Sequence, residues 1–135
     1  MTSVKIGLEI HVPLKTEKKL FCDCPTSYHD TDEPNSLVCE VCTAMPGIKP
    51  RPVNARALEA VITIAHLLNC KIPEKKIFMK RKHYNYPDLP KGYQITSEPI
   101  GEEGKFSFED GSFDDIGIWE VHLEEDPGQY NLSKG

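Results

Sequence analysis

Hydrophobic and polar residues alternate at the start of the chain, from residue 4 to residue 14. One side of this segment is aliphatic throughout and carries Val4, Ile6, Leu8, Ile10 and Val12. An alternation with a period of two predicts a half-buried strand. The opposite side then presents Glu9 and His11 together, about 6 to 7 Å apart. A carboxylate and an imidazole on one rigid face can share a metal ion, and they can equally face water.

A second pattern, with helical spacing, runs from residue 55 to residue 68. Its apolar positions are Leu58, Val61, Ile62, Ala65 and Leu68. Because Asn54 is a suitable N-cap and Asn69 a suitable stop, the pattern predicts a helix that covers one face of the sheet. His66 and Cys70 are expected to pack rather than to act chemically.

Alternation returns in the last third of the chain and predicts a β-hairpin. Its arms cover residues 105–109 and 113–123 and flank a turn at Asp110 and Gly111.

The second arm leads into three consecutive acids, Glu124, Glu125 and Asp126. The side chains of consecutive residues on a strand point to opposite faces of the sheet. The pattern therefore leaves open which of Glu124 and Glu125 would face a metal ion. Such a cluster repels itself and is tolerated in open water or beside a cation, and Mg²⁺ prefers oxygen ligands of this kind. If this arm lies in one sheet with residues 4–14, the acids meet Glu9 and His11 across the ladder.

Four of the five cysteines lie in a loop predicted over residues 21–45. Cys22 and Cys24 form a C-x-C pair, and Cys39 and Cys42 form a C-x-x-C pair. Two close pairs of thiolates match a tetrahedral, structural zinc site. A redox dithiol is the alternative, but four ligands leave zinc no open position for catalysis. His29, between the pairs, is expected to be a surface residue.

The segment from residue 80 to residue 97 combines basic residues, tyrosines and a proline-rich turn. The basic cluster is Lys80, Arg81 and Lys82, and the turn reads P-D-L-P-K-G. We expect a stiff loop here, which can direct donors such as Lys91 and Tyr93 to phosphate or carboxylate oxygens at little ordering cost. The composition fits equally well a surface loop whose tyrosines lie over the core.

Length and charge narrow the classes of function. The 135 residues make about one domain. A formal net charge of −5 argues against indiscriminate nucleic-acid binding, although residues 71–82 hold six basic residues and one acid, and residues 102–126 hold ten acids and one lysine. We expect a cytoplasmic protein, because no secretory signal or membrane span is evident and paired cysteines in a reducing compartment usually bind metal.

Four motifs together resemble one family. They are G-L-E-I-H at residues 7–11, the two cysteine pairs, Y-P-D-L-P-K-G-Y-Q-I at residues 86–95 and H-L-E-E-D at residues 122–126. In this order they resemble the B subunit of the aspartyl/glutamyl-tRNA amidotransferases, and the related archaeal E subunit is similar. The resemblance covers nearly the whole chain, and any single motif would be weak.

This resemblance implies an α+β fold with an antiparallel sheet, a covering helix and a zinc-bound loop. Residues 1–135 would then be the N-terminal part of a glutamine-synthetase-like catalytic domain, inactive alone. The family uses ATP and Mg²⁺ to phosphorylate the carboxylate of Glu or Asp misacylated on a tRNA, and then replaces the phosphate with ammonia. The ammonia comes from a partner amidase subunit, and a small accessory subunit is also expected.

The resemblance also assigns roles to individual residues. The catalytic set is Glu9, His11, Lys82, Tyr84 and Glu125; the magnesium ligands are Glu9, His11, Glu124 and Glu125; and the nucleotide contacts are Lys91, Tyr93 and Glu124. Lys82 and Tyr84 match positions near the ammonia outlet. The chain departs from many bacterial relatives at residues 127–129, so Gln129 receives no role. A zinc-stapled module that binds RNA or protein through residues 80–93 remains the alternative.

Overall fold

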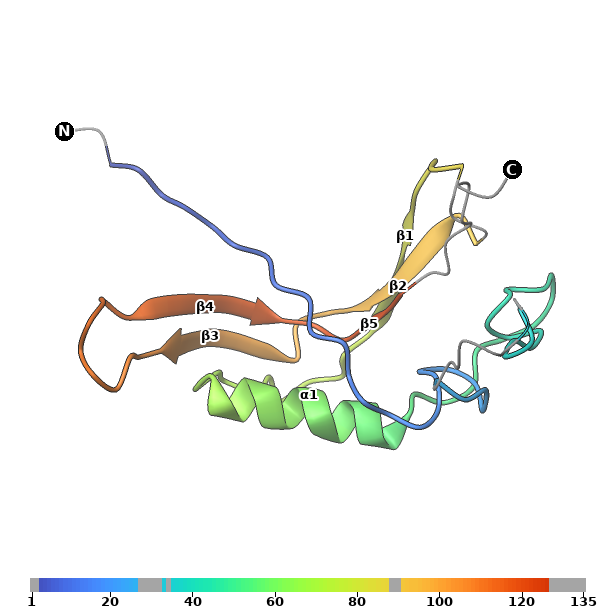
Figure 1. The fold of residues 1–135 in the computed structure, drawn as a ribbon, viewed down its shortest axis with the longest axis horizontal. Coiled ribbons are helices and arrows are strands. Elements are labelled where there is room, and N and C mark those ends of the chain that lie inside the picture. Colours follow the sequence, from blue (N-terminus) through green and yellow to red (C-terminus); the bar gives the residue numbers. More distant parts are fainter. Residues whose placement is uncertain (1–2, 27–32, 34, 88–90, 127–135) are drawn as a thin grey trace.

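The chain folds into one helix and two small antiparallel sheets (Figure 1). A computed structural model describes residues 3–26, 33, 35–87 and 91–126. The elements are α1 (Ala55–Leu67), β1 (Met79–His83), β2 (Tyr93–Ser97), β3 (Gly101–Phe106), β4 (Ile116–Val121) and β5 (Glu124–Glu125). One sheet has the order β1-β2-β5, and the other pairs β3 with β4. The predicted α+β class with antiparallel strands is therefore confirmed.

Helix α1 forms where the sequence predicts it. The side chain of Asn54 caps it by accepting hydrogen bonds from the backbone amides of Arg56 and Ala57. After the helix, Asn69 adopts a φ of 54°, a left-handed conformation that ends it. His66, which was expected to pack, is exposed because it lies on the helix face that points away from the sheet.

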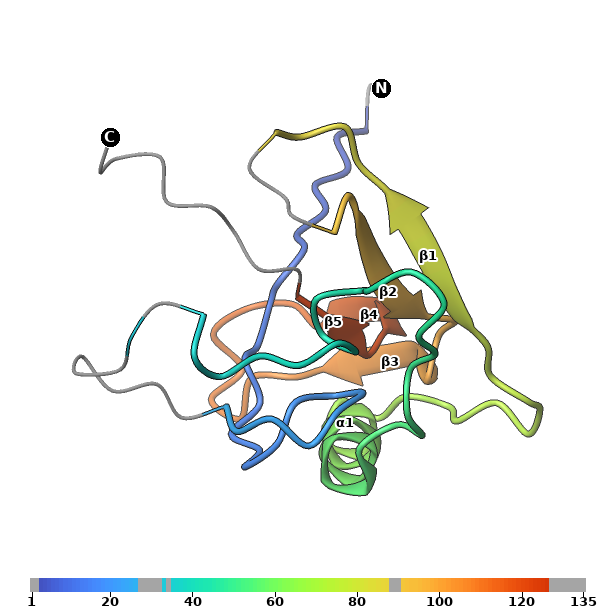
Figure 2. The same cartoon turned by 90° about the vertical axis from the view of Figure 1, so that its right-hand side faces the viewer.

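The core lies between α1 and the region where the two sheets meet. Its buried members are Ala57, Val61, Ile100 and Leu123. Ile100 precedes β3 and Leu123 precedes β5, so the helix packs against the strand connections and against β3 and β4. Figure 2, which looks along the helix, shows α1 beneath these two strands.

The predicted hairpin is present as β3 and β4, with different bounds. Phe106 pairs with Ile116, so the strands end earlier and the predicted turn lies inside a longer loop. Within that loop the ring of Phe108 lies 5.2 Å from that of Phe106 and 5.3 Å from that of Phe113. The predicted turn itself forms, because the backbone amide of Gly111 donates to the carbonyl of Phe108 at 3.1 Å and Gly111 adopts a φ of 65°.

Strand β3 approaches the end of α1 so closely that glycine is required. A Cβ atom on Gly104 would lie 2.5 Å from the carbonyl oxygen of Leu68, and one on Gly101 would lie 2.8 Å from Cβ of Ala65. Cys70 fills the space beside both glycines and is buried. Its predicted packing role is confirmed.

The segment expected as a stiff loop contains two strands instead. β1 and β2 pair from Met79 opposite Ser97 to His83 opposite Tyr93, and the backbone amide of Tyr84 donates to Gly92. Residues 84–87 and 91–92 lie outside the two strands, and residues 88–90 of the predicted turn lie outside the described part of the chain. Ile95 in the middle of β2 is buried and its neighbours Gln94 and Thr96 are polar. This alternation is typical of a strand with one face on the core, and it favours the pairing of β2 with β1.

The strand predicted over residues 4–14 does not form. Within the described parts of the chain no segment pairs with it, and it runs as an extended trace away from the body (Figure 1). Its aliphatic side chains are 63% to 87% exposed from Val4 to Val12. Alternation specifies which side chains share a face, but a strand also needs a hydrogen-bonding neighbour. No helix of the described residues has the length and apolar character needed to cross a bilayer.

Candidate active site and metal centre

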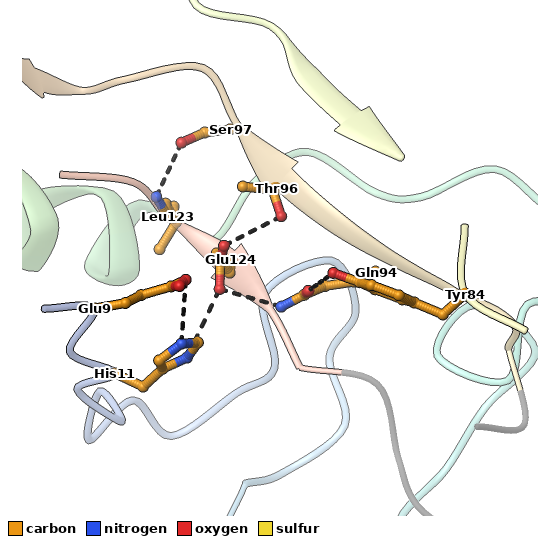
Figure 3. A network of polar contacts seen from close by, with 8 residues as sticks. All are labelled: Glu9, His11, Tyr84, Gln94, Thr96, Ser97, Leu123 and Glu124. Atoms are coloured by element: carbon orange, nitrogen blue, oxygen red, sulfur yellow. Dashed lines mark hydrogen bonds and ion pairs between the residues drawn. The ribbon is translucent and has the colours of Figure 1, made fainter. Parts of the chain in front are cut away.

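The carboxylate of Glu124 is held by polar side chains of the neighbouring strand (Figure 3). Glu124 lies opposite Thr96 in the β2–β5 pair and accepts a hydrogen bond of 3.3 Å from its hydroxyl. The side-chain amide of Gln94 donates to the other carboxylate oxygen at 3.1 Å. The hydroxyl of Tyr84 in turn donates to the amide oxygen of Gln94 at 3.1 Å. This chain of hydrogen bonds gives the carboxylate a defined orientation.

The start of β5 is anchored from the same strand. The hydroxyl of Ser97, which is buried, accepts a hydrogen bond of 2.9 Å from the backbone amide of Leu123. The backbone amide of Ser97 donates to the carbonyl of Leu123 at 2.8 Å. A two-residue strand is therefore aligned with β2, and the register that places Glu124 opposite Thr96 follows from it.

His11 brings the N-terminal segment to Glu124. Its Nδ1 atom lies 3.9 Å from Oε2 of Glu124, and its Nε2 atom lies 3.5 Å from Oε1 of Glu9. Glu9, His11 and Glu124 thus converge, as Figure 3 shows. The side chains of Glu9 and His11 are exposed, whereas that of Glu124 is largely covered.

The arrangement suits a divalent cation beside His11 and Glu124. Two carboxylates and an imidazole are a suitable donor set. Glu124 contacts Nδ1 of His11, whereas Glu9 contacts Nε2 on the opposite side of the ring. A single ion bound to Nδ1 could therefore also bind Glu124, but the side chain of Glu9 would have to change its rotamer to reach that ion. Among the described residues, only the four cysteines bring three or more ligand atoms within 4.8 Å of one another.

Glu125 lies on the other face of the sheet and contacts different groups. It stands opposite Ile95, and its carboxylate is paired with the ammonium of Lys91. The side chain of Lys91 is 7% exposed and that of Glu125 is 16% exposed. Tyr93 lies on this same face, with the guanidinium of Arg81 4.9 Å from its ring centre. Lys91, Tyr93 and Glu125, all predicted site residues, are therefore gathered away from His11.

Lys82 and Tyr84 lie on the Glu124 side of the sheet. Lys82 borders a hollow of about 230 Å³ whose lining residues are Lys75, Lys80, Lys82, Thr96, Ser97, Glu98, Pro99 and His122. Lys80 is paired with Glu98 at 3.2 Å, and the imidazole of His122 contacts the carbonyl of Ser97. Three lysines outnumber the single glutamate in this lining, so the hollow is positively charged beside the carboxylate of Glu124.

Sequence reasoning missed Gln94 and Thr96. Both alternate with the buried Ile95, so their shared face could have been read from the pattern Q-I-T. Their contact with Glu124 could not, because it depends on the pairing of β2 with β5.

The four predicted metal-binding cysteines are brought together. Their sulfur atoms all lie within 4.8 Å of one another, although fourteen residues lie between the two pairs in the sequence. The backbone amide of Cys39 donates to Sγ of Cys42 at 3.2 Å, which turns the second pair inward. Zinc bound at about 2.3 Å from each sulfur in a tetrahedron needs sulfurs about 3.8 Å apart, so the cluster fits such an ion. His29 lies outside the described residues.

The thiols of this cluster differ in acidity. Burial and hydrogen bonds with the thiols of Cys39 and Cys22 raise the pKa of Cys24 to about 12, and burial also raises the pKa of Cys22. A hydrogen bond from the backbone amide of Cys42 lowers the pKa of Cys39 to about 7. Because thiolates bind metal, Cys39 is the ligand most ready to do so.

Comparison with known proteins identifies relatives over almost the whole chain. The family model described as "GatB/GatE catalytic domain" matches residues 4–134. Proteins named as the B subunit of aspartyl/glutamyl-tRNA(Asn/Gln) amidotransferase are 56% identical in Methanocaldococcus jannaschii and 54% identical in Methanococcus maripaludis, each over 98% of this chain. The protein of that name from Methanopyrus kandleri is 51% identical over 100% of it. The chain spans 26% to 28% of the length of these relatives.

Proposed function

The chain belongs to the GatB/GatE catalytic-domain family, and we propose that it carries the phosphoryl-transfer site of a tRNA-dependent amidotransferase. The substrate is Glu or Asp misacylated on a tRNA, as the names of the relatives suggest. The convergence of Glu9, His11 and Glu124 is the observation that supports this proposal. Since the chain spans about a quarter of its relatives, the complete activity belongs to a longer protein.

The reaction needs an activated carboxylate. An oxygen of the substrate carboxylate attacks the γ-phosphorus of ATP and ADP leaves, which forms an acyl phosphate. Ammonia then attacks the carbonyl carbon, phosphate leaves and a proton is lost, so the product is the amide. The carboxylate itself is a poor electrophile because its leaving group would be oxide.

The residues of the site divide this work. Glu9, His11 and Glu124 would hold Mg²⁺, which would supply positive charge to phosphate oxygens that otherwise repel the substrate carboxylate. His11 would have to bind the ion as a neutral imidazole. Gln94 and Thr96 hold Glu124 in place. Lys82 adds positive charge from the neighbouring hollow.

Ammonia reaches the site unprotonated, because ammonium has no lone pair to attack with. We assign its outlet to Lys82 and Tyr84, and its production to a partner amidase subunit, with a small accessory subunit completing the complex. A route that excludes bulk water keeps the ammonia neutral. The reaction takes place in the cytoplasm, where tRNA is aminoacylated and the five free cysteines stay reduced.

The cysteine cluster would hold zinc as a scaffold. Its four sulfur atoms would fill the coordination sites of the ion, which would then stabilise the loop that joins residue 21 to α1 and take no part in the reaction. The surrounding glutamine-synthetase-like sheet, which residues 4–14 would join, is part of the same proposal.

The decisive experiment replaces Glu124 in the full-length protein, assembled with its partners. Glu124→Gln retains the size and shape of the side chain beside Gln94 and Thr96, but it removes the negative charge. We expect ATP-dependent amidation to fall by about 100-fold. Glu120→Gln, an exposed acid on β4, is the control and should retain activity. An unchanged amidation rate in Glu124→Gln would remove Glu124 from the site.

The three-lysine hollow favours one competing function, a zinc-stapled module that binds RNA. Such a module would bind RNA without ATP, with an affinity that falls steeply as salt is raised. Strong binding by the chain that disappears when Lys80, Arg81 and Lys82 are neutralised would support this alternative over the enzyme site.

A further inference from the structure

Lys19 connects the two cysteine pairs. Its backbone amide donates to the carbonyl of Cys24 at 3.0 Å, which ties it to the first pair. Its side chain crosses to the second pair, where Nζ lies 2.7 Å from the carbonyl oxygen of Leu37 and 3.6 Å from Sγ of Cys42. Lys19 is half-buried, and its side chain therefore lies between the two loops rather than in open water.

The charge of a zinc-loaded cluster calls for such a group. Four thiolates and one Zn²⁺ carry a net charge of −2, and burial of Cys22 makes part of that charge costly. Two other cations lie close in sequence or space, but Lys18 and Arg51 are both paired with the carboxylate of Asp23. Among the described residues, Lys19 is the cation with a direct contact to a cluster sulfur.

We propose that Lys19 is a positioning residue of the metal centre, which donates a charge-assisted hydrogen bond to Cys42 and offsets one of the two negative charges. This inference rests on the proposed occupation of the cluster by zinc. The bond draws electron density from one sulfur of the four, and it holds the second cysteine pair against the first. Cys42 is consequently a poor nucleophile, and the positive charge of Lys19 favours the negatively charged, metal-loaded cluster.

The test compares Lys19→Met with Lys19→Arg in the 135-residue chain loaded with Zn²⁺ or Co²⁺. Methionine keeps a long apolar stem and removes the charge and donors, whereas arginine retains both. We expect Lys19→Met to lower zinc affinity by about tenfold or more, measured by chelator competition. We also expect the sulfur-to-cobalt charge-transfer band to move to lower energy, because the sulfur becomes richer in electrons.

A second readout locates the effect on one atom. Iodoacetamide alkylates a metal-bound thiolate by forming a carbon–sulfur bond as iodide leaves, and peptide mapping gives a rate for each cysteine. Alkylation of Cys42 should rise by about tenfold in Lys19→Met, as expected for the loss of one hydrogen bond to a charged group, and Lys19→Arg should restore the slow rate. Lys18→Met is the matched control.

Each outcome decides the matter. An unchanged band and unchanged Cys42 rate in Lys19→Met would overturn the proposal, as would equal acceleration at all four cysteines, which indicates general loosening. If Lys19→Met binds no metal, recovery in Lys19→Arg supports the proposal and failure to recover opposes it. A wild-type chain that binds no metal would overturn the zinc site as well, which separates the two failures.

Discussion

The side-chain amide of Gln94 donates a 3.1 Å hydrogen bond to the carboxylate of Glu124, thirty residues further along the chain. The amide oxygen of Gln94 is in turn held by Tyr84. The amide group therefore has one orientation that satisfies both neighbours, and that orientation presents its NH₂ group to the glutamate.

If Glu124 belongs to the proposed phosphoryl-transfer site, replacing Gln94 should weaken the binding of magnesium by the full-length protein. In Gln94→Leu the carboxylate loses its closest hydrogen-bond donor, and we expect the Mg²⁺ concentration for half-maximal amidation to rise by about 10- to 100-fold. Thr96→Val, which removes the longer contact of 3.3 Å, should have a smaller effect. A Gln94→Leu enzyme with the normal Mg²⁺ dependence would show that Glu124 needs no such support.

The ion pair of Lys91 and Glu125 should contribute strongly to stability. Lys91→Met leaves the carboxylate of Glu125 covered and unpaired, which is expected to lower the free energy of unfolding by about 3 kcal/mol. The double variant Lys91→Met/Glu125→Leu should recover most of this loss. Urea denaturation gives both values.

A matched control for that pair exists on the surface. Lys71 and Glu103 also form an ion pair, but their side chains are 76% and 69% exposed. Lys71→Met should therefore change the free energy of unfolding by less than about 1 kcal/mol. If the two lysine variants were equally stable, the pair at Lys91 would have no special weight.

Gly104 should tolerate no side chain. A methyl group there meets Leu68 and Cys70 at distances that demand a shift of β3 away from α1. We expect Gly104→Ala to destabilise the chain by about 1 to 3 kcal/mol. Gly117→Ala, on the paired strand with nothing within 4 Å of the new atom, should be nearly neutral. Thermal unfolding of the two variants compares them directly, and equal melting temperatures would contradict the close packing.

Proton release on zinc binding should depend on pH through Cys39. Its pKa is about 7, so at about pH 6 it is a thiol that loses a proton when it binds, and at about pH 8 it is already a thiolate. Cys24, with a pKa of about 12, releases its proton at both values. The number of protons released per zinc should thus fall by nearly one as pH rises.

Calorimetry in buffers of different ionisation enthalpy measures that number. The affinity for zinc should fall as the pH is lowered, because protons compete with zinc for the same sulfur atoms. Cys70→Ala, which removes the one cysteine outside the cluster, should leave the count unchanged. A count that stayed constant between the two pH values would mean that Cys39 has an ordinary acidity.

Local signals in the sequence determined several features of this protein. Asn54, Val61, Ala65 and Asn69 suffice to predict α1, because a helix makes its hydrogen bonds within itself. The spacing of the cysteines predicted the cluster, since the chemistry of four thiolates leaves few alternatives. The opposite directions of Glu124 and Glu125 follow from the pleat of a strand.

Only the tertiary structure decided which segments meet. The partner of a strand lies far away in the chain, so alternation could not reveal that β5 pairs with β2. It could not reveal either that Gln94 and Thr96 donate hydrogen bonds to Glu124, or that Lys91 forms an ion pair with Glu125. The same limit explains the failure at residues 4–14, where the pattern of a strand is present and a neighbouring strand among the described residues is not. His11 still reaches Glu124 from this segment, because that contact requires proximity of two side chains and no backbone pairing.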